Sequence, residues 1–128
     1  MRLWNVLVAV SGAACAGSAP PKVLFIGNSY TYFNNLPAMV SALGRGDGRP
    51  IQTAMIVRGG ATLDDHWKGD SAAAAIRRGG WTHVVLQEQS QLGNYVVING
   101  APAIFDDGGF VAAAGRFDAI IRQGGAKT

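Results

Sequence analysis

The sequence KVLFIGNS, residues 22–29, joins a continuous apolar run to a short polar break. Strands of parallel sheets are buried on both faces and have such runs, so we predict a strand over 22–26. Gly27-Asn28-Ser29 ends it. Asn34 or Asn35 can then cap a helix over 36–43, which has Pro37 in its first turn. A buried strand that leads into a helix is the first unit of an alternating fold.

The rest of the chain continues this alternation. Short apolar runs predict further strands over 51–57 and 84–87. Between them, Thr62 or Asp64 starts a short turn, and Ser71 caps a helix over 72–78 that ends at Gly79. A long loop is predicted over 90–102. This order implies an α/β fold with a parallel sheet and right-handed crossovers.

The last predicted helix, 109–123, has an apolar face and ends at Gly124 or Gly125. The residues that share this face at helical spacing are Phe110, Val111, Ala114, Phe117, Ile120 and Ile121. A sheet that ends at the third strand leaves an open edge with unpaired backbone groups. It also leaves little sheet for this helix to pack on. We therefore expect residues 20–128 to be poorly stable and to aggregate.

Length and composition exclude several classes of protein. A chain of 128 residues with 48% hydrophobic and 15% charged residues makes one globular domain. The net charge of +3 is spread along the chain, which argues against a nucleic-acid partner. No apolar run reaches the roughly 18–20 residues of a membrane span. A single cysteine excludes an internal disulfide framework and a Cys-rich zinc site.

The first 19 residues have the order of a secretory signal: Arg2, an apolar run over 3–14, then small residues. We predict a signal peptide over 1–19 and the folded domain over 20–128. A lipoprotein signal that ends before Cys15, with Cys15 acylated, is a second interpretation. A buried first strand, Leu7–Val10, is a third. The first two place the protein outside the cytoplasm, secreted or periplasmic, with a lipid anchor if Cys15 is acylated.

Polar or glycine-rich segments follow all three predicted strands, at 27–32, 58–66 and 87–93. Ligands bind outside the carboxyl ends of parallel strands, so these segments are the candidate site. Ser29 lies between a buried strand and a helix N-terminus, where positive potential favours an oxyanion. It is a candidate nucleophile. The alternative is a turn serine that hydrogen-bonds to its own backbone.

The other two segments carry weaker candidates. His66 with Asp64 and Asp65 could suggest a metal site, but adjacent residues rarely point to one centre. We expect a solvated helix start there and no metal. Glu88 could be a general base, but an exposed carboxylate at the strand end is the preferred interpretation. Glutamine amides in the third segment could donate hydrogen bonds to a developing oxyanion.

Three blocks in this order, VLFIGNSYTYFNNLPAMVSAL, VRGGATLDDHW and THVVLQEQSQ, resemble the SGNH/GDSL hydrolases. The resemblance is to a subgroup whose first block reads Gly-Asn-Ser, and it extends from Lys22 to the end. It implies a flavodoxin-like three-layer sandwich and a serine ester hydrolase without metal or organic cofactor. Ser29 matches the nucleophile, and Gly60, with Gly59 second, matches the oxyanion glycine. Gln89, with Gln87 close behind, stands where the family has an asparagine.

The sequence departs from the family where the base should be. The family has Asp-x-x-His, but the residues three before His66 and His83 are Leu63 and Gly80. We therefore expect the N-terminal part of such a hydrolase, truncated at the C-terminus and inactive alone. The implied substrates are small-molecule or carbohydrate esters that carry an acyl or acetyl group. The alternatives are a non-catalytic crevice that binds a sugar or small polar ligand, and an unfolded remnant of a truncated gene.

Overall fold

The computed structural model describes residues 19–90, 95–104 and 107–128. Its elements, in chain order, are β1 (Lys22–Gly27), α1 (Ser29–Tyr32), α2 (Leu36–Gly46), β2 (Gln52–Val57), α3 (Leu63–Lys68), α4 (Ser71–Arg77), β3 (His83–Leu86), β4 (Tyr95–Ile98), β5 (Ala101–Ile104) and α5 (Asp107–Gln123). The predicted signal, apart from residue 19, lies outside the described residues, and so does Cys15. Export therefore stays a prediction.

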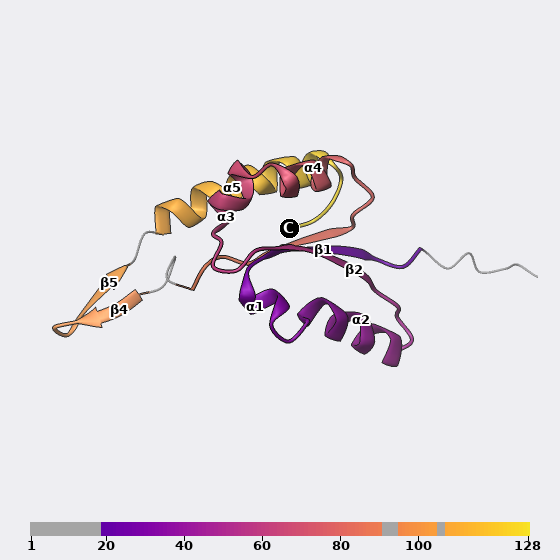
Figure 1. Ribbon diagram of the computed structural model, residues 1–128, viewed down its shortest axis with the longest axis horizontal. Coiled ribbons are helices and arrows are strands. Elements are labelled where there is room, and N and C mark those ends of the chain that lie inside the picture. The colour runs from indigo at the N-terminus through magenta and orange to yellow at the C-terminus, as the bar shows by residue number, and fades with distance from the viewer. Residues whose placement is uncertain (1–18, 91–94, 105–106) are drawn as a thin grey trace, which may run out of the picture.

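The main sheet has three parallel strands in the order β2-β1-β3. The central strand pairs on both sides, so that Leu24 lies between Ala54 of β2 and Val84 of β3. Helices α1 and α2 cover one face of the sheet, and α3, α4 and α5 cover the other (Figure 1). This confirms the predicted α/β fold with a parallel sheet, and it is consistent with a flavodoxin-like sandwich.

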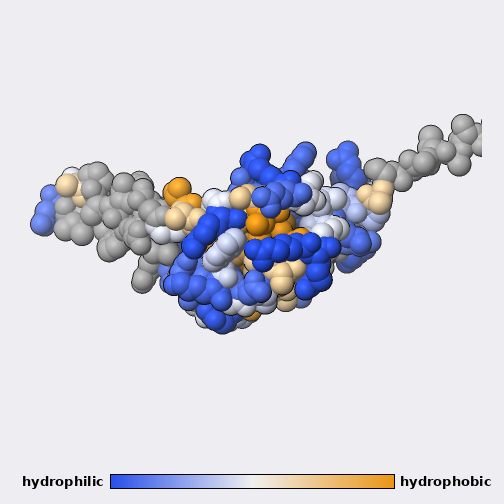
Figure 2. Space-filling view, turned by 90° about the horizontal axis from the view of Figure 1, so that it is seen from above, coloured by the Kyte–Doolittle hydropathy of each residue, from blue (hydrophilic) through white to orange (hydrophobic). Residues whose placement is uncertain are grey.

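The hydrophobic core lies between the sheet and the α3–α5 layer. Leu24 and Ile26 of β1 meet Phe117 and Ile121 of α5 there, and all four are fully buried. The ring of Trp67 packs edge-on against Phe117, with 5.1 Å between the centroids. Figure 2 looks down on this layer and shows a mostly polar surface around an apolar patch. This side of the sheet is therefore well covered.

Two expectations about α5 and the sheet edge need correction. The predicted apolar face is buried or partly buried, so α5 does find a surface to pack on. Val111, which is predicted on that face, is the exception and is 63% exposed. The outer edge of β3 is paired at its beginning, because the Lys127 N–H donates to Thr82 O and the Val84 N–H donates to Lys127 O. The edge is thus not open along its whole length.

The predicted loop over 90–102 is wrong, because it contains an antiparallel hairpin of β4 and β5. Its turn residues, Asn99 and Gly100, have φ angles of 51° and 80°. Positive φ at both central residues is the type I′ pattern, for which Asn-Gly is the favoured pair. The hairpin projects from the three-layer body (Figure 1).

Two helix starts also differ from the prediction. Ser71 is the first residue of α4 rather than its cap, and Asp70 precedes it with a φ of 57° and no capping hydrogen bond. The short helix α1 was not predicted; it begins at Ser29, immediately after β1. Among the helices that the structure describes, none combines the length and apolar character needed to cross a membrane.

Candidate functional site at the carboxyl ends of the strands

Ser29 lies where β1 passes into α1, at the carboxyl edge of the sheet. Asn28 caps α1 and is buried: its side-chain oxygen accepts from the Tyr30 N–H at 3.2 Å, and its amide donates to Ala61 O at 3.0 Å. Ser29 itself is half-buried and lines a cavity of about 250 Å³ beside Tyr30 and Phe33. Within the described ranges its hydroxyl has no hydrogen-bond partner. A fixed backbone thus presents an uncommitted hydroxyl.

Gln87, at the end of β3, holds the β1–α1 junction in place. Its side-chain oxygen accepts from the Asn28 N–H at 2.9 Å and from the Thr31 hydroxyl at 2.9 Å. Its amide nitrogen donates to the Glu88 carbonyl. The space is so tight that a Cβ at Gly27 would lie 2.5 Å from that Gln87 oxygen. These contacts make Gln87 a positioning residue, which weakens its candidacy as an oxyanion donor.

The two glycines after β2 form a turn from Arg58 to Ala61, closed by a hydrogen bond from the Ala61 N–H to Arg58 O at 3.2 Å. Gly60 occupies the third position of this turn with a φ of 68°. A type II turn requires a positive φ at that position, and glycine adopts it without strain. Gly59 approaches α1, since a Cβ on it would lie 3.1 Å from the Tyr32 hydroxyl. The turn therefore lies beside the helix that Ser29 begins.

The expectation for Glu88 is wrong. It is not an exposed carboxylate: it is half-buried and accepts from the Leu63 N–H at 3.0 Å and 3.2 Å. It also accepts from the Gln89 N–H at 2.6 Å. The Leu63 N–H is at the start of α3, where helical N–H groups lack partners and a negative charge is stabilising. Glu88 therefore ties the end of β3 to α3, and Gln89 follows it half-buried at the same edge.

Neither histidine of the chain contacts Ser29. His66, expected at a solvated helix start, is buried with 6% exposure, and its Nε2 lies 2.8 Å from Gly27 O. His83 is exposed at the beginning of β3, the opposite end of the sheet from Ser29, and its Nδ1 bonds to the Thr82 hydroxyl at 3.0 Å. The site as described contains a candidate nucleophile without a histidine base.

The two aspartates of α3 are committed to protein partners. Hydrogen bonds from Lys68 and Arg116, each at 2.6 Å, hold the pKa of Asp64 below its ordinary value. The pKa of Asp65 is lowered by hydrogen bonds from the backbone and hydroxyl of Thr62. No cluster of three potential metal ligands occurs in the part of the chain that the structure describes.

Comparisons with protein-family models, with curated proteins and with solved structures found no match for this chain. A functional assignment therefore depends on the geometry at the carboxyl ends of β1, β2 and β3 and on the sequence resemblance.

Proposed function

We propose that this protein is a serine ester hydrolase in which Ser29 is the nucleophile. The observation that carries the proposal is the uncommitted Ser29 hydroxyl on a junction fixed by Asn28 and Gln87. A serine between a buried strand and a helix N-terminus suits acyl transfer, because nearby N–H groups can stabilise the oxyanion. The proposed substrates are small acyl or acetyl esters, esters of carbohydrates among them, in an extracytoplasmic compartment.

In this mechanism the Ser29 oxygen attacks the ester carbonyl and its proton passes to a base. The backbone N–H groups of Ser29 and Gly60 and the Gln89 amide are the proposed donors to the tetrahedral oxyanion. The intermediate expels the alcohol and leaves an acyl group on Ser29, which water then hydrolyses. The proposal requires a base other than His66 and His83, which bond elsewhere.

A second candidate is a crevice at the same edge that binds a sugar or small polar ligand without reacting with it. The observation that favours it is the lack of any contact between Ser29 and a histidine. The two candidates differ in whether a covalent acyl group forms.

Acyl capture with an external base tests the proposal. The full chain is incubated with p-nitrophenyl acetate and imidazole, and the site of acetylation is located by mass spectrometry. We expect acetyl-Ser29 and a protein-dependent rate that Ser29→Ala abolishes; in a complete triad the loss is on the order of 10³-fold or more.

Ser41→Ala is the matched control, since Ser41 lies on α2 and donates to Ile51 O. It should retain both the adduct and the rate. Acetylation elsewhere, or an unchanged rate in Ser29→Ala, would show that Ser29 is not the nucleophile. Binding of a sugar at this edge without acylation would favour the second candidate.

A further inference from the structure

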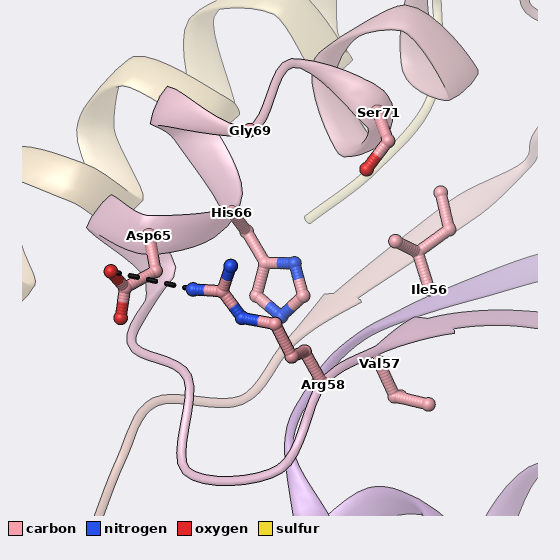
Figure 3. A pocket seen from close by; sticks show the side chains of 7 residues that line it. All are labelled: Ile56, Val57, Arg58, Asp65, His66, Gly69 and Ser71. Carbon is pink, nitrogen blue, oxygen red and sulfur yellow. Dashed lines mark ion pairs between the residues drawn. The ribbon is translucent and has the colours of Figure 1, made fainter.

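A second cavity, of about 290 Å³, lies at the carboxyl end of β2 under α3 and the start of α4 (Figure 3). Ile56 forms its apolar wall, and Arg58, Asp65, His66 and Ser71 supply its polar groups; Val57 also lines it, but the Val57 side chain points away from His66 (Figure 3). None of these residues lines the cavity at Ser29. It is therefore a separate site.

His66 brings an unused nitrogen to this cavity. Its Nε2 lies 2.8 Å from Gly27 O, and a carbonyl oxygen can only accept, so Nε2 carries the hydrogen. In the neutral ring Nδ1 is then a hydrogen-bond acceptor, and it has no partner in the described structure. In the described residues, every fully buried polar side-chain atom has a hydrogen-bond partner. Because Nδ1 has none, it is not fully buried, and we infer that it is accessible from the cavity that His66 lines. Figure 3 shows this nitrogen facing the space near Ser71 and Ile56.

The charges in the lining compensate each other. Arg58 Nη2 lies 3.4 Å from Asp65 Oδ1, so the cavity has no net formal charge when His66 is neutral. An anion here would meet the Asp65 carboxylate and the lone pair of His66 Nδ1. A cation would meet the Arg58 guanidinium. A hydroxyl group suits the site better, because it can donate to Nδ1 and accept from Arg58 or from the Ser71 hydroxyl.

We propose that this cavity binds an uncharged polyhydroxylated small molecule, with one ligand hydroxyl donating to His66 Nδ1. The C–H groups of the ligand pack on the Ile56 side chain. The site does not depend on Ser29, so the proposed hydrolase activity can fail while this inference stands.

Nitrogen NMR of the histidine rings in the full chain tests the proposal. Glycerol and D-glucose are the neutral probes, inorganic phosphate is the anionic one, and exposed His83 is the internal reference. We expect the free protein to have hydrogen on His66 Nε2. Each polyol should shift the His66 Nδ1 resonance while the His83 signals stay in place.

A cavity-filling variant localises the effect. Ser71→Leu places a larger side chain at the mouth and should abolish the polyol shift while His66 keeps hydrogen on Nε2. Ala42→Leu, at an exposed position of α2 on the opposite face of the sheet, should leave the shift unchanged.

Three outcomes would overturn the proposal. The first is no polyol shift in the wild-type chain up to roughly 100 mM, well above the millimolar range of weak small-ligand binding. The second is a phosphate-induced shift that strengthens at acid pH, which would indicate an anion site. The third is a polyol shift that persists in folded Ser71→Leu.

Discussion

The close packing around Gly27 leaves no room for a side chain at that position. Its backbone pairs with Val57 in the sheet, and its carbonyl accepts from His66 Nε2. A Cβ there would lie 2.5 Å from the side-chain oxygen of Gln87 and 2.6 Å from the Thr31 hydroxyl. Glycine is required here because a side chain would collide with the Gln87 oxygen and the Thr31 hydroxyl. The hydrogen bonds of these two groups hold Asn28, and with it Ser29, in place.

We expect Gly27→Ala to lower the free energy of unfolding by about 1–3 kcal/mol, the usual cost of forcing extra atoms into a packed region. Urea denaturation followed by circular dichroism measures this. Gly115→Ala is the control, because Gly115 is an exposed residue within α5 and a Cβ there meets nothing within 4 Å. It should stabilise the helix by roughly 0.5–1 kcal/mol. A Gly27→Ala chain as stable as wild type would contradict the packing argument.

For individual residues, the sequence predicts the position in the fold better than it predicts the hydrogen-bond partners. Ser29, Gly60 and Gln89 follow apolar runs, so local pattern alone places them at one edge of the sheet. The Gln87 side chain accepts from Asn28 and Thr31, which lie 59 and 56 residues away along the chain, and the Glu88 side chain accepts from Leu63, 25 residues away. Local sequence patterns do not encode contacts between residues so far apart. The structural roles of Gln87 and Glu88 could therefore not be predicted from the sequence.

The first turn of helix α3 contains a capping box. Thr62 caps it, with its hydroxyl accepting from the Asp65 N–H at 3.1 Å, while Asp65 accepts from the Thr62 N–H at 3.0 Å. This reciprocal capping box satisfies two N–H groups that the helix leaves unpaired. It also positions His66, the next residue, whose ring reaches Gly27.

We expect Asp65→Asn to cost about 1 kcal/mol at neutral pH, and the cost to disappear in acid. The pKa of Asp65 is lower in the folded chain than its ordinary 3.8, so its contribution is present above that value. The contribution is lost as the pH falls through the folded value. Unfolding free energies of the two chains, measured from pH 7 down to about pH 2, should therefore converge.

Asp47→Asn, at an exposed position after α2, controls for the loss of one negative charge. A difference between wild type and Asp65→Asn that stays constant over the whole pH range would refute the capping role.

Elements that lie in the core were predictable, while those that depend on turn chemistry were missed. Strands β1, β2 and β3 are recognisable as apolar runs because their side chains pack in or against the core. Helix α5 is recognisable from the spacing of Phe117 and Ile121 for the same reason. The hairpin was missed although Asn99-Gly100 between apolar residues is a strong turn signal. Helix α1 is a single turn, too short for periodicity to reveal.

The molecule as a whole divides into a packed three-layer body and the β4–β5 hairpin, which projects from it (Figure 1). Among the residues whose burial the structure describes, the buried core consists of residues from the body. We therefore expect replacement of residues 95–104 by a short Gly-Ser linker to change the melting temperature by less than about 5 °C, the equivalent of roughly 1 kcal/mol.

The comparison is Phe117→Ala, which removes a fully buried ring and should cost about 3–5 kcal/mol. Thermal unfolding of the two chains should differ accordingly. If loss of the hairpin lowers the melting temperature as much as Phe117→Ala does, the hairpin is part of the stable core.

Gly27, Thr31 and Gln87 fill one space, and this limits how the sequence can vary. One oxygen of Gln87 serves both the Asn28 N–H and the Thr31 hydroxyl, and Gly27 leaves room for it. A larger residue at any of the three positions requires a smaller or differently bonded one at another. Folded variants selected from a library randomised at these three positions should therefore carry compatible combinations of residues, so that a change at one position is accompanied by a change at another.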